Sequence, residues 1–81
     1  MNDSMTRDPR TDPQSGDVLL ERGSTHPIVI GRSKRISTGE IRVVYGDGNG
    51  YGWVTGLDKW RARVANSTVI YVNPEGVGPD A

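Results

Sequence analysis

The fold class is decided by residues 40–55, which read EIRVVYGDGNGYGWVT. In the first part of this stretch the apolar side chains of Ile41, Val43 and Tyr45 alternate with Arg42 and Val44. Alternation with a period of two is typical of a β-strand that buries one face. The glycine-rich segment at 46–50 contains Asp-Gly and Asn-Gly, which supply the positive φ angles of a tight hairpin turn. We therefore predict two antiparallel strands, at 40–46 and 51–55, joined by a hairpin.

Three further strands and one short helix are expected around this hairpin. Aliphatic and β-branched residues bounded by turn-forming residues predict strands at 17–21 (DVLLE), 27–32 (PIVIGR) and 68–72 (TVIYV). In the segment 57–65, Leu57, Trp60 and Val64 recur at spacings of three and four, which indicates a helix of about two turns.

The order of these elements indicates the architecture. Strand, strand, strand, strand, short helix, strand is the order found in SH3-like barrels. Closing the sheet into a barrel is one way in which a short all-β chain protects its edge strands. We therefore expect an all-β fold with one short helix, in the form of a small five-stranded SH3-like barrel. The alternative is an open antiparallel sheet with the helix laid across one face.

The chain of 81 residues has room for one small domain. Residues 1–15 contain two prolines, five charged residues and no aromatic or β-branched aliphatic residue, so we expect a flexible N-terminal arm. Residues 74–81 (PEGVGPDA) are expected to form a flexible C-terminal tail for similar reasons. The predicted barrel domain therefore comprises residues 16–73.

The composition argues against several classes of function. Hydrophobic residues make up 33% of the chain and phenylalanine is absent, so little apolar material is available to enclose an active-site cavity. There is no cysteine, and His26 is the single histidine, so we expect no metal centre, no cofactor and no nucleophilic triad. No apolar run is long enough for a membrane span or a secretory signal. We expect a cytoplasmic, non-catalytic binding module with no membrane partner.

Basic side chains concentrate in the central segment. Residues 16–73 hold eight Lys/Arg and five Asp/Glu, a net charge of +3, and the two terminal segments cancel it with −1 and −2. A basic face beside exposed aromatic rings is typical of small barrels that bind single-stranded nucleic acid. Arginine and aromatic side chains are also the usual anchors of protein interfaces. The candidate binding residues under either interpretation are Lys34, Arg35, Arg42, Tyr51, Arg61 and Arg63.

A protein partner is the interpretation that we favour, because the net charge of zero lacks the basic excess of nucleic-acid-binding domains. We expect docking through the hairpin around Tyr51 and the helix surface around Arg61 and Arg63, while Trp53 and Trp60 serve as core anchors. A strand edge at 27–32 is a candidate for pairing with a partner's sheet or with a second copy in a homodimer. Nucleic acid is the alternative partner.

Three short motifs point to a possible origin. The segment DPQSGDVL at 12–19, the VVY strand at 43–45, and Trp53 followed by LDKW at 57–60 together resemble small uncharacterised proteins encoded by prophages and Mu-like phages. The resemblance spans residues 12–72. It implies a protein made in the bacterial host cell that docks on a host macromolecular complex, with inhibition of a defence system as the concrete hypothesis. It implies no catalytic residue.

Overall fold

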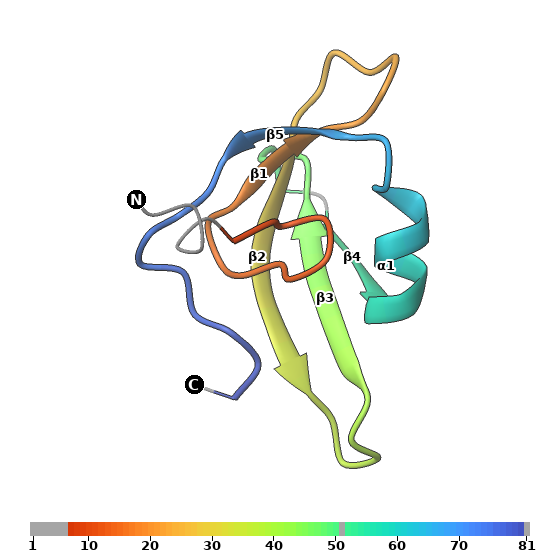
Figure 1. Ribbon diagram of the computed structural model, residues 1–81, viewed down its shortest axis with the longest axis vertical. Coiled ribbons are helices and arrows are strands. Elements are labelled where there is room, and N and C mark those ends of the chain that lie inside the picture. The colour runs from red at the N-terminus through yellow and green to blue at the C-terminus, as the bar shows by residue number, and fades with distance from the viewer. Residues whose placement is uncertain (1–6, 51, 81) are drawn as a thin grey trace.

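The computed structural model describes residues 7–50 and 52–80, and it has five antiparallel strands and one short helix (Figure 1). The elements are β1 (Val18–Leu20), β2 (Ile28–Arg35), β3 (Ile41–Gly46), β4 (Gly52–Gly56), α1 (Leu57–Arg63) and β5 (Thr68–Tyr71). The predicted order and the all-β class with one helix are confirmed. β2 continues beyond the predicted end at residue 32, and α1 ends before residue 65.

The strands lie in the order β4-β3-β2-β1-β5, and every neighbouring pair is antiparallel. This order fits that of an SH3-like barrel, but the sheet is not closed, so β4 and β5 remain its two edges. β2 pairs with β1 on one side and with β3 on the other. The prediction that residues 27–32 offer an exposed strand edge is therefore wrong.

A bulge in β2 determines which of its side chains reach the core. The register against β3 shifts between Ile30 and Arg32, so Gly31 is an extra residue in the strand. Because side chains alternate between faces, the extra residue places both Ile30 and Ser33 on the buried face. Bulges also increase the local twist of a strand.

Trp60 on α1 is the centre of the hydrophobic core. Its side chain has no exposed surface, and its indole N–H donates a hydrogen bond of 3.0 Å to the carbonyl oxygen of Pro9. α1 lies beside β3 and β4 in Figure 1 and packs against both strands. The prediction that Trp60 anchors the core is confirmed. The other buried apolar side chains are Leu19, Ile28, Ile30, Val43, Tyr45 and Val64.

The packed unit extends beyond residues 16–73 on both sides, since Arg7 contacts Asp17 and the backbone N–H of Val77 donates a hydrogen bond of 2.9 Å to the hydroxyl of Ser15. Asp17 is fully buried, and its carboxylate accepts hydrogen bonds from the guanidinium of Arg7 and from the backbone N–H groups of Gln14 and Asn73, both 2.8 Å long. One side chain thus ties residue 7, the start of β1 and the chain after β5 together. These contacts were not expected from segments that we interpreted as flexible.

Candidate functional site

Three aromatic rings run from the core to the surface at β4: Trp53 stacks on Tyr45, and Trp60 lies at a tilt against Tyr45. Tyr45 and Trp53 are direct partners in the β3–β4 register, and their ring centroids lie 5.8 Å apart with an interplanar angle of 26°. On its other side Tyr45 contacts Trp60, at 5.2 Å between centroids. Tyr45 is buried, whereas Trp53 is 51% exposed. The prediction that Trp53 is a core anchor is therefore wrong, because β4 is an edge strand and no strand covers its outer side among the described residues.

Arg63 approaches the same stack from the last turn of α1. Its Nη1 donates a hydrogen bond of 2.7 Å to the hydroxyl of Tyr45, and its guanidinium carbon lies 5.4 Å from the centroid of that ring. Its Nε and Nη2 donate to the two carboxylate oxygens of Glu21, at 3.1 and 3.3 Å. The hydrogen bond to Glu21 is the largest cause that raises the pKa of Arg63. The side chain is half-exposed, so part of it remains accessible, although Glu21 balances its charge.

We call Glu21, Tyr45, Trp53 and Arg63 the Tyr45 cluster. Tyr45 is its centre, since Trp53 stacks on the ring and Arg63 donates to the hydroxyl. Holding two accessible side chains in fixed positions reduces the entropy that is lost when a partner binds. Of the predicted binding residues, Arg63 belongs to this cluster. Glu21, Tyr45 and Trp53 were not among them, and Trp53 had been assigned to the core.

Lys34 and Arg42 are the two predicted residues that the sheet brings together. They are direct partners in the β2–β3 register, on the face opposite the buried Ser33 and Val43. The Nη2 of Arg42 donates a hydrogen bond of 3.1 Å to Glu40, while its Nε is buried and has no partner among the described residues.

The remaining predicted residues lie apart from that pair. Arg35 follows Lys34 and so points to the other face, where it donates two hydrogen bonds of 2.8 and 2.9 Å to Asp80. Arg61 on α1 donates a hydrogen bond of 3.0 Å to the carbonyl oxygen of Thr11. Tyr51 lies outside the described residues. The single basic face that the sequence suggested is therefore divided among separate places.

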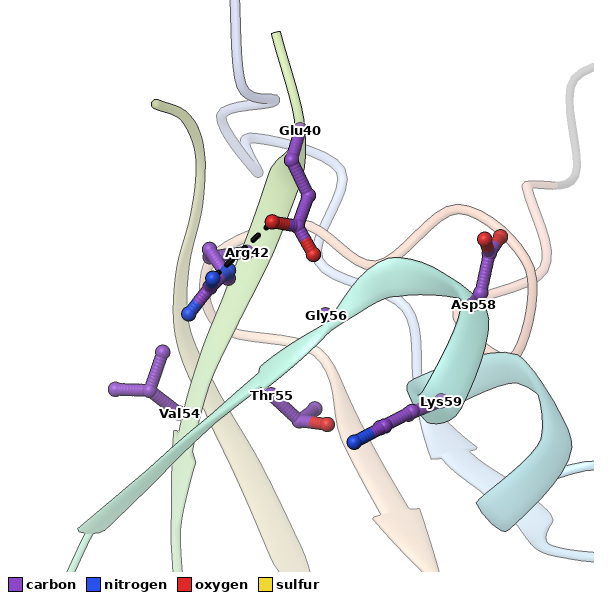
Figure 2. Close-up of a pocket in the computed structure, with 7 residues that line it drawn as sticks. All are labelled: Glu40, Arg42, Val54, Thr55, Gly56, Asp58 and Lys59. Carbon is purple, nitrogen blue, oxygen red and sulfur yellow. Dashed lines mark hydrogen bonds and ion pairs between the residues drawn. The ribbon is translucent and has the colours of Figure 1, made fainter. Parts of the chain in front are cut away.

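A shallow hollow of about 360 Å³ lies beside β4, at the start of α1 (Figure 2). Two acids and two cations line it, so its formal charge is balanced. Figure 2 shows the carboxylate of Glu40 turned toward Arg42, with which it forms an ion pair of 3.1 Å. The lining residues are Glu40, Arg42, Val54, Thr55, Gly56, Asp58 and Lys59.

Two further findings concern the part of the chain that the structure describes. In residues 7–50 and 52–80, no group of three or more His, Cys, Asp or Glu side chains is placed to hold a metal ion. Within the same residues, no helix has both the length and the apolar character needed to cross a membrane.

Comparisons of the chain with protein-family models, with curated proteins and with solved structures gave no match.

Proposed function

We propose that this protein is a non-catalytic protein-binding module that docks on a larger complex through the exposed surfaces of Trp53 and Arg63. The observation that carries the proposal is the half-exposed ring of Trp53, which the Tyr45 cluster holds in place. Tryptophan and arginine are the side chains most enriched among the residues that dominate protein interfaces. The resemblance to phage-encoded proteins suggests a complex of the bacterial host, in the cytoplasm, as the partner, including a defence complex that docking would block.

The distribution of charge favours a protein over nucleic acid as the partner. Binding to a phosphate backbone depends on cations that are free to replace its counterions. In the described residues, five arginines already form ion pairs with acids of the same chain. They are Arg7, Arg10, Arg35, Arg42 and Arg63. An anchor built on an aromatic ring does not need such an excess of free cations.

The test is a tagged pull-down from bacterial lysate, in which Trp53→Ala is compared with Ile70→Ala. Ile70 on β5 is a matched control, because it is 53% exposed and lies at the opposite edge of the sheet. Each bait is used with and without nuclease treatment, and circular dichroism checks that both variants are folded. We expect the same protein with the wild-type bait and with Ile70→Ala in both lysates, and its loss with Trp53→Ala.

Salt provides an independent measurement on the purified complex. A protein interface anchored on Trp53 should lose less than about tenfold in affinity between 50 and 200 mM salt, whereas a protein that contacts six to ten phosphates loses about 10³–10⁵-fold. Recovery only without nuclease, together with a steep dependence on salt, would overturn the proposal. It would favour a nucleic-acid-binding sheet that uses the face of Lys34 and Arg42.

A further inference from the structure

The edge strand β4 lacks three of the features that commonly protect an exposed edge. Its sequence, GWVTG, has no charged residue and no proline, and its register against β3 shows no bulge. Native proteins commonly blunt an edge with lysine, proline or a bulge, because its unpaired backbone groups otherwise accept another strand. On the side away from β3, no strand pairs with β4 in the part of the chain that the structure describes.

β4 is complementary to itself when two copies are related by a two-fold axis through Val54. Antiparallel pairing then places Val54 opposite Val54, Trp53 opposite Thr55, and Gly52 opposite Gly56, so all five residues of the strand are paired. Residues that are directly opposite must lie on the same face of the sheet. Every pair meets this condition, because the members of each pair are separated by an even number of positions.

The pairs themselves are favourable. Tryptophan opposite threonine is an aromatic and β-branched pair, a combination that stabilises antiparallel sheets. Val54 is 56% exposed, so two copies of it would cover each other. Glycine at both ends of the strand has no side chain to obstruct an approaching backbone.

The other edge does not have this property. β5 has four residues, Thr68–Tyr71, and full overlap of two copies would place Val69 opposite Ile70. Neighbouring residues of one strand point to opposite faces, so this register is excluded. A two-fold register that pairs every residue of the strand therefore distinguishes β4 from β5.

The charge beside β4 is also compatible with a second copy. The hollow at this edge has two acids and two cations among its lining residues, and the whole chain has a formal net charge of zero. A strongly charged partner would meet as many like charges as opposite charges there. A second copy of this neutral chain does not meet that difficulty.

We propose that two copies of this protein form a homodimer by antiparallel pairing of β4 with β4 around Val54. The two sheets join into one continuous sheet, and both Trp53 side chains lie on the same side of it. The inference does not depend on the identity of a host partner, because it concerns the backbone edge of β4.

The first test is the mass of the protein in solution, measured by light scattering after size exclusion over a range of concentrations. We expect the wild type to approach twice the chain mass of 8.8 kDa. Val54→Glu should remain monomeric, since like charges directly opposite each other destabilise strand pairs. Ile70→Glu is the matched control, because it places the same charge on an exposed position of β5 and should still dimerise.

The second test uses the absence of cysteine from the chain. A single Val54→Cys substitution places two thiols opposite each other across the proposed axis, whereas Ile70→Cys places its thiol away from it. Under mild oxidation, Val54→Cys should form a covalent dimer more than about tenfold faster than Ile70→Cys, because pairing raises the effective thiol concentration.

Three results would overturn the homodimer: a wild type that is monomeric at all concentrations, a Val54→Glu protein that still dimerises, or equal rates of cross-linking at the two positions. A monomer that still captures a protein in a manner dependent on Trp53 would overturn the homodimer and leave the proposed function intact. A dimer that captures no protein would support the homodimer and overturn the proposed function.

Discussion

Among the carboxylates of the described residues, Asp17 is the one whose replacement by the corresponding amide, Asp17→Asn, should destabilise the fold most. The side chain of Asp17 is fully buried, and that of its ion-pair partner Arg7 is 15% exposed. Each carboxylate oxygen of Asp17 accepts one hydrogen bond from Arg7 and one from a backbone N–H, which belongs to Gln14 at one oxygen and to Asn73 at the other. An asparagine keeps the shape but turns an NH₂ group toward two of these donors and removes the negative charge.

The expected loss is about 3–5 kcal/mol, the usual cost of leaving one member of a buried ion pair without its partner. For a chain of this length the free energy of unfolding is about 4–12 kcal/mol, so the loss is a large share of it. With a urea m-value of about 1.5 kcal/mol/M, the unfolding midpoint should fall by about 2–3 M.

The assay is urea unfolding followed by tryptophan fluorescence, which reports on the buried Trp60. Asp80→Asn is the matched control. It makes the same chemical change in the exposed ion pair with Arg35, and the midpoint should fall far less than in Asp17→Asn. A fall of less than about 0.5 M for Asp17→Asn would refute the conclusion that this buried carboxylate holds the N-terminal segment and the chain after β5 to the sheet.

Two further predictions concern the same terminal segments. Trp60→Phe removes the N–H that donates to the carbonyl of Pro9, and leaving that buried oxygen unpaired should cost about 1–3 kcal/mol in thermal or urea unfolding; an unchanged stability would contradict it. The hydrogen bonds from Arg35 lower the pKa of the Asp80 carboxyl below its ordinary value. This contact therefore stabilises the folded chain fully at pH values above the ordinary pKa. The stabilisation is lost as the pH falls through the lowered pKa and Asp80 becomes protonated. A carboxyl titration by NMR should show the Asp80 pKa rising in Arg35→Ala, and an unchanged pKa would contradict the contact.

Local patterns in the sequence were sufficient to predict the elements. The period-two alternation at 40–46, the glycine turn that follows it and the three-and-four spacing around Trp60 all depend on residues close together in the chain. In the structure, Gly48 and Gly50 adopt the positive φ angles that the turn prediction requires. Each of these features depends on residues that are close together in the chain, so the sequence alone was enough to predict it.

The position of an element in the sheet depends on pairing between distant segments, and local periodicity does not report it. Trp53 looked like a core residue, because a chain without phenylalanine needs large apolar side chains inside. Its exposure follows from β4 being at an edge, which is decided by the pairing of β2 with both β1 and β3. The one local signal was the glycine at each end of a strand without charge, which is compatible with an edge that approaches another backbone.

The predicted basic face shows how a count of charges differs from their arrangement. The value of +3 for residues 16–73 arose because the two terminal segments, with their acids, were treated as separate from the domain. In the structure Asp80 forms an ion pair with Arg35, and the carbonyl oxygen of Thr11 accepts a hydrogen bond from Arg61. The terminal segments thus supply partners to two of the cations that the sequence had assigned to a binding surface. The exposed part of the Trp53 ring is not occupied by a terminal segment among the described residues. Trp53 is therefore a better anchor for another protein than Arg35 or Arg61.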